Sequence, residues 1–208
     1  MPTPKPQIRN AFATPICIHY LPVATEVNAE LRPLVLDRMQ ADTGGTATSW
    51  RSATDFESWG GVSAETLFRM LRELADSLTA TRAGGRVSLD WKIGACAEVR
   101  QKGESLAVAT RPGAFWAGVY VIDDGYAKSD DETLGGECEL MDPRGHLSGC
   151  LPPHLGFRIP GGATAGMSEI IRPQSGLILM HPGWMARGER EFGGNGQRIT
   201  IEFELALP

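Results

Sequence analysis

Histidines and carboxylates are the side chains of this chain that could bind a transition metal. The four histidines lie far apart in the sequence, and no two of them have the short spacing typical of a metal site: His19, His146, His154 and His181. His181 would need a carboxylate from elsewhere, with Glu137, Glu139 and Asp142 as candidates. Isolated histidines are more often structural than metal-binding. We therefore keep a metal site formed by His181 and Glu137 only as the alternative interpretation.

The cysteines could in principle bind zinc or carry out redox chemistry. They are scattered along the chain without any Cys-x-x-Cys pair: Cys17, Cys96, Cys138 and Cys150. This pattern argues against a zinc knuckle and against a dithiol redox motif. We expect buried free thiols.

The first 85 residues are expected to supply a strand, helices and a loop that contains tryptophans. Residues 13–21 are apolar and β-branched, as in a strand, and a helix opens near Thr25, with Pro33 expected to kink or divide it. Residues 43–61 are loop-like and contain two tryptophans, Trp50 and Trp59. Ser63 is a candidate N-cap for a second helix, whose apolar residues recur every three or four positions: Leu67, Met70, Leu71, Leu74 and Leu78.

From Arg86 onwards, short apolar runs alternate with turns. The runs are VSLDWKIGACAEV, FWAGVYVI, GECELM, SEIIR, GLILMH and RITIEFELAL. Six or more strands after two helices predict a mostly β fold with a helical flank (α+β), in the form of a barrel or jelly roll. We expect residues 1–208 to form a single domain, since a chain of this length buries one sizeable core.

Several of these segments, in this order, resemble a known family. GAFWAGVYVIDDG, GGECELMDPRG, SEIIRPQSGLILMHPGW and RITIEFEL are similar to segments of the bacterial 2-oxoglutarate and iron(II) dependent oxygenases, a branch of the double-stranded β-helix superfamily. WRSATDF resembles the tryptophan-serine segment that precedes the barrel of that family. The resemblance runs from about Trp50 to the end of the chain and implies a double-stranded β-helix.

The places of the family's metal ligands are altered in this chain. Members have His-x-His-Pro-Gly at the entry to the Gly-Val-Tyr strand and a further histidine after a Pro-x-Trp segment; these places fall on Ala109, Arg111 and Arg187. Alanine has no lone pair to offer, and a guanidinium has no acceptor and keeps its proton. Because a non-haem iron site normally needs two imidazoles and a carboxylate, the resemblance implies a barrel without its iron triad, and we expect no metal cofactor.

One family feature is retained at the start of the last strand. Arg198 matches the arginine that in such enzymes grips the distal carboxylate of 2-oxoglutarate through a two-pronged contact. The alternative is a surface arginine paired with Glu202 or Glu204. Tyr120 could line the same pocket, or it could be a core tyrosine.

Glu98 lies on the strand before the altered metal motif, where relatives often have asparagine. If Arg111 and Arg187 point inward, a carboxylate beside them offsets the cost of burying their charge. Two alternatives follow: a salt-bridged plug that fills the former metal cavity, or an arginine-rich pocket in which Arg111, Arg187 and Arg198 bind a small anion such as 2-oxoglutarate or another dicarboxylate.

Composition limits the partners and the location. The formal net charge is −5 with mixed signs, so no basic field would attract nucleic acid. No stretch reaches the length of a membrane span, and the first residues lack the pattern of a signal peptide, so we expect a cytoplasmic protein that does not bind membranes.

Three functions are compatible with the sequence. The first is a non-catalytic or functionally altered oxygenase-like protein with an arginine-rich pocket for a small anionic ligand. The second is an active 2-oxoglutarate and iron(II) dependent dioxygenase with relocated metal ligands. The third is a protein-interaction module built on the barrel. Fold alone does not choose among them, because function belongs to the site.

Overall fold

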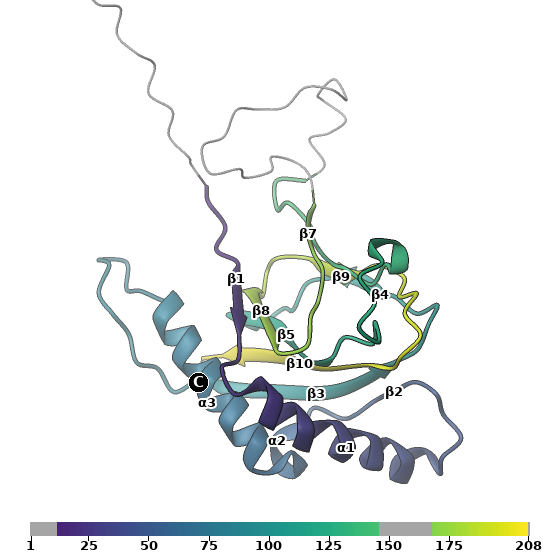
Figure 1. The fold of residues 1–208 in the computed structure, drawn as a ribbon. Helices are drawn as coiled ribbons and strands as arrows, with labels where there is room; N and C mark the ends of the chain where they lie inside the picture. The colour runs from purple at the N-terminus through teal and green to yellow at the C-terminus, as the bar shows by residue number, and fades with distance from the viewer. Residues whose placement is uncertain (1–11, 146–167, 208) are drawn as a thin grey trace, which may run out of the picture.

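Two antiparallel sheets make up the centre of the computed structural model, which describes residues 12–145 and 168–207 (Figure 1). The larger sheet has the strand order β1 (Cys17–Tyr20), β8 (Leu177–Pro182), β5 (Trp116–Asp123), β10 (Arg198–Ala206), β3 (Lys92–Arg100) and β2 (Trp50–Arg51). The smaller sheet has the order β4 (Leu106–Ala109), β9 (Arg187–Glu189), β6 (Cys138–Leu140) and β7 (Glu169–Ile171). The expected mostly β fold with a helical flank is confirmed.

The helices lie on one face of the larger sheet (Figure 1). They are α1 (Ala24–Thr43), α2 (Phe56–Trp59) and α3 (Gly61–Leu78), and the short 3₁₀ helix η1 (Glu132–Leu134) lies elsewhere, between β5 and β6. Pro33 was expected to kink or divide the first helix; the division is wrong, because α1 is continuous through it. Pro33 is on the exposed side of α1, while buried residues on both sides of it anchor the helix in one core: Val27, Leu31, Val35 and Met39.

The start of the second long helix also differs from the prediction. The helix α3 begins at Gly61, with Gly60 as its N-cap, so Ser63 is not the cap. The Ser63 hydroxyl instead donates to the Glu30 carboxylate at 2.5 Å and ties α3 to α1. Leu78, predicted to be in the apolar stripe, is the last helical residue and is 37% exposed.

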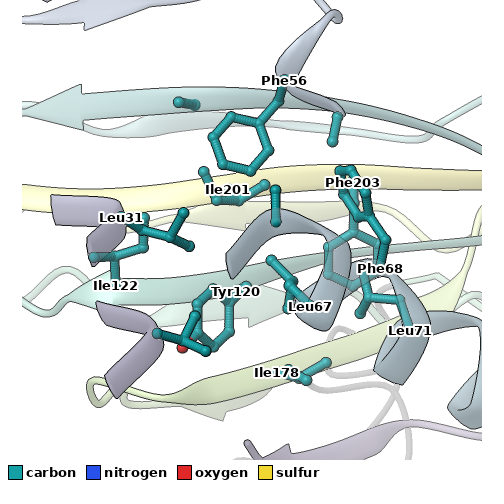
Figure 2. Close-up of a cluster of buried hydrophobic side chains, with 14 of the residues drawn as sticks. Leu31, Phe56, Leu67, Phe68, Leu71, Tyr120, Ile122, Ile178, Ile201 and Phe203 are labelled. Atoms are coloured by element: carbon teal, nitrogen blue, oxygen red, sulfur yellow. The ribbon is translucent and has the colours of Figure 1, made fainter. Parts of the chain in front are cut away.

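The main hydrophobic core fills the space between the larger sheet and the helices. Side chains at alternate positions of the strands point towards the helices, as a strand period of two requires, and include Tyr120 and Ile122 of β5 and Ile201 and Phe203 of β10 (Figure 2). Leu67 and Leu71 of α3 meet them and are fully buried. Each buried leucine contributes about 1.5–3 kcal/mol to the stability.

The other face of the larger sheet points towards the smaller sheet and is partly charged. On β10 it carries Arg198, Thr200 and Glu202, and the register places Arg100 beside Arg198 and Glu98 beside Thr200. A second apolar cluster lies on the same side, with Val119, Val121, Leu177, Leu179, Cys138, Leu140, Ile171 and Met185. The space between the sheets is therefore part apolar and part ionic.

Candidate functional site

The structure brings together, at one end of the smaller sheet, the three residues at the places that the resemblance assigns to metal ligands. Ala109 of β4 and Arg187 of β9 are directly paired in the sheet register. Arg111, two residues beyond Ala109, reaches the same carboxylate oxygen as Arg187: its Nη2 is 3.8 Å from Oε2 of Glu202, and Nη2 of Arg187 donates to that oxygen. Segments that are far apart in the sequence thus meet where the resemblance implies a metal site.

These residues do not fit an iron ion. Ala109 has no donor atom, and Arg111 and Arg187 present only N–H groups and a positive charge. Across residues 12–145 and 168–207, no group of three or more histidine, cysteine, aspartate or glutamate side chains is placed to hold a metal. No chemistry that requires iron can be derived from the groups at this place.

Arg187 is buried and stays charged because two carboxylates face it. Its side chain is 3% exposed, it donates to Glu202, and its Nη1 lies 3.4 Å from Oε1 of Glu189. Burial on its own lowers the pKa of the guanidinium, but the negative charges of Glu202 and Glu189 and the hydrogen bond to Glu202 outweigh it, so the net pKa is raised. The group is a permanent cation in the barrel.

Glu189 is the second centre of this ionic cluster. Its Oε2 lies 2.6 Å from Nη1 of Arg100 and 3.8 Å from Nη1 of Arg198, so that together with Arg187 three arginines face one carboxylate. Burial raises the pKa of Glu189, but the arginines, with Arg100 first, lower it by more. The carboxylate is ionised.

Glu98 does neutralise arginines, but not the pair expected from the sequence. It binds Arg51 of β2, and its Oε2 lies 3.1 Å from Nη2 of Arg100. Burial is the main cause that raises its pKa, followed by the charge of Glu202. The carboxylates that face Arg111 and Arg187 are Glu202 and Glu189, and Arg111 also reaches Glu204 at 3.3 Å.

Arg198 lies inside the barrel, so the alternative of a surface arginine is wrong. It is 1% exposed, donates from Nη1 to the carbonyl of Gly136, and donates from Nε to the carbonyl of Asp124 at 3.2 Å. Its guanidinium stacks at 4.3 Å on Phe192 and at 4.9 Å on Tyr126. Protein groups therefore occupy much of its donor capacity.

Gly136 permits this close approach. Its φ is +77°, in the left-handed region, and a Cβ atom there would lie 2.5 Å from Nη1 of Arg198. A side chain at this position would push the guanidinium out of its place.

The structure does not bring Tyr120 to the arginines. Tyr120 points to the helix side of the sheet, where its hydroxyl donates to Oδ1 of Asn28 at 2.5 Å (Figure 2). Burial is the main cause that raises its pKa. Tyr120 is a core residue with a satisfied hydroxyl.

The alternative metal candidates interact with other groups. His181 is buried, its Nδ1 lies 3.0 Å from the carbonyl of Pro182, and burial lowers its pKa to about 4, with smaller effects of Arg187 and Arg111. The charge of Glu137 instead acts on Tyr126, towards the Arg198 end. Glu139 pairs with Arg190 at 3.4 Å and Asp142 with Arg144 at 2.7 Å. His146, His154 and Cys150 lie outside the described residues.

The described cysteines are free thiols, as expected, but Cys17 is only partly buried. Cys96 and Cys138 are buried, and burial raises the pKa of each to about 12. At neutral pH both are protonated, which makes them poor nucleophiles. In the described part of the chain no helix is long and apolar enough to cross a membrane.

Comparison with known proteins supports the fold. No family model and no curated protein matches the sequence. Among solved structures, the chain is similar to a prolyl-4-hydroxylase from Pseudomonas putida (9% identity, 94% of each chain covered, TM-score 0.61). It is also similar to AviO1 from Streptomyces viridochromogenes Tue57 (14% identity, 94% of this chain and 90% of that chain, TM-score 0.62).

A third similar structure is that of HygX from Streptomyces hygroscopicus with nickel and 2-oxoglutarate bound (11% identity, 93% of this chain and 83% of that chain, TM-score 0.61). The chain therefore shares the fold of these structures, the double-stranded β-helix that its segments predict. At these identities the similarity establishes the fold alone.

Proposed function

We propose that this protein is a pseudoenzyme with an oxygenase-like barrel, in which an arginine–glutamate network takes the place of the iron triad. The observation that carries the proposal is the buried Arg187–Glu202 pair beside Ala109. A guanidinium offers no lone pair to a metal, and its charge repels a divalent cation. The function then rests on binding, to a small molecule or to a protein partner, and not on oxidation.

Iron content and turnover test this proposal. The purified protein is loaded anaerobically with Fe(II), desalted, and assayed for iron per chain and for conversion of 2-oxoglutarate to succinate. We expect iron far below one per chain and no succinate above background. One retained iron per chain that is lost in His181→Ala or Glu137→Ala, but kept in Glu139→Ala, would establish the relocated-ligand dioxygenase and defeat the proposal.

A small anion is a second candidate, supported by unused donors near Arg198. Within the described residues, Nη2 of Arg198, Nε of Arg100 and Oγ1 of Thr200 are buried and make no hydrogen bond. Since Arg198 and Arg100 are neighbours in the sheet and Thr200 follows on the same face, these donors could share one acceptor. A dicarboxylate of the 2-oxoglutarate class is the ligand that the resemblance suggests.

Calorimetry decides between this candidate and a closed plug. 2-Oxoglutarate and succinate are titrated into the wild type and into Arg198→Ala and Arg111→Ala. Saturable heat that disappears in Arg198→Ala would support the anion site. Absence of heat from both acids would leave the salt-bridged plug as the better account of the interior.

A further inference from the structure

Glu189 forms ion pairs with more arginines than any other described carboxylate. Its two oxygens face Arg100 at 2.6 Å, Arg187 at 3.4 Å and Arg198 at 3.8 Å. These arginines come from three different strands, β3, β9 and β10, and so from both sheets. The Glu189 side chain is 2% exposed, so bulk water cannot screen these contacts.

The buried charges of the described residues balance with Glu189 included. Three arginines, Arg100, Arg187 and Arg198, and three glutamates, Glu98, Glu189 and Glu202, are buried, so their formal charges cancel. Without the Glu189 carboxylate the same space would hold an uncompensated cation, which is costly in a protein interior.

We infer that Glu189 acts as an intramolecular ligand: its carboxylate fills an anion site lined by Arg100, Arg187 and Arg198. The inference deepens the proposed function and rests on it, because it explains what fills a barrel that does not hold iron. It also specifies the class of molecule that this site accepts, a small monocarboxylate, once the Glu189 side chain no longer occupies it.

Truncation of Glu189 to alanine makes the inference testable. The change removes the Cγ methylene and the carboxylate, which together have nearly the size and charge of acetate. Acetate should therefore enter the space that Glu189→Ala leaves and restore the missing contacts. Acetamide, of similar shape but neutral, should not.

The experiment measures thermal and urea unfolding of the wild type and Glu189→Ala in acetate, acetamide and chloride, at matched ionic strength. Glu204→Ala is the matched control, because Glu204 is an exposed carboxylate on β10 that also pairs with an arginine. We expect Glu189→Ala alone to be stabilised saturably by acetate, with the unfolding equilibrium constant falling about tenfold at ten times the dissociation constant.

Two results would overturn the inference: equal stabilisation of all three proteins by acetate, or equal effects of acetate and acetamide on Glu189→Ala. If Glu189→Ala does not fold in chloride, its refolding yield is compared in the three solutes, with the isosteric Glu189→Gln as the folded reference. Recovery in acetate alone supports the site, and recovery in none of them refutes it. Retention of iron would refute the proposed pseudoenzyme without touching the acetate result, so the two failures can be told apart.

Discussion

Replacing both members of the buried Arg187–Glu202 pair should cost less stability than the more damaging of the two single replacements. The change is Arg187→Met, Glu202→Leu and the double variant, which keep the approximate volume of the side chains while removing the charges. Arg187 and Glu202 are 3% and 5% exposed, so neither charge left alone can turn to bulk water.

The structure sets the expected order of the losses. After Arg187→Met, Glu202 keeps only Arg111 at 3.8 Å, whereas after Glu202→Leu, Arg187 keeps Glu189 at 3.4 Å. Breaking a buried pair costs about 3–5 kcal/mol, so we expect the upper end for Arg187→Met and the lower end for Glu202→Leu. For a chain of this size these values correspond to a fall of about 6–20 °C in melting temperature.

The assay is urea unfolding followed by tryptophan fluorescence and circular dichroism, with the four proteins forming a double-mutant cycle. We expect the double variant to lose less than the worse single variant, because apolar replacement of a whole buried pair is often neutral. A double variant that loses the sum of the two single losses would show no coupling between the residues. That result would refute the view that the pair is a buried unit in solution.

Two further predictions concern the helical layer and the pH dependence of stability. Leu71→Asp should abolish cooperative unfolding, because Leu71 is fully buried. Leu78→Asp on the same helix, at a position 37% exposed, should change the melting temperature little. Equal melting temperatures of Leu71→Asp and the wild type would mean that α3 does not cover the sheet. The pKa of His181 falls to about 4 in the folded protein against about 6.5 when unfolded, so the unfolded chain binds more protons between these values. His181 therefore costs no stability above pH 6.5 and an increasing amount as the pH falls towards 4. The unfolding free energy of the wild type minus that of His181→Leu should decrease over this pH range. A difference that does not change with pH would contradict a buried neutral imidazole.

The elements that the sequence predicts well are those with a regular apolar pattern. Leu67 and Leu71 at helical spacing, and Ile199, Ile201 and Phe203 at strand spacing, lie in the core between α3 and the larger sheet. The strands β4 and β9 have only four and three residues, too few for a periodic signal, and were missed. Pro33 does not divide α1, because buried residues on both sides of it hold the helix in one piece.

The site could be predicted only in part, because ionic partners depend on which strands are neighbours. Arg111, Arg187 and Arg198 were found from family motifs, yet nothing local in the sequence indicates that Glu189 faces Arg100. The two are 89 positions apart and meet only through the packing of the two sheets. The signal that could have identified Glu189 is the run Arg-Gly-Glu at residues 187–189, in which a strand period of two places both charges on one face.

The buried charges around Arg187 depend on one another. Arg187 needs Glu202 to be tolerated in the interior, and Glu202 in turn needs Arg187, since Arg111 alone approaches it no closer than 3.8 Å. Histidine at position 187 alone would leave that carboxylate without its main cation, while Ala109 still supplied no ligand. The charges of the barrel therefore constrain one another as a set, which means that a change from this ionic interior to a metal-binding one requires several substitutions at once.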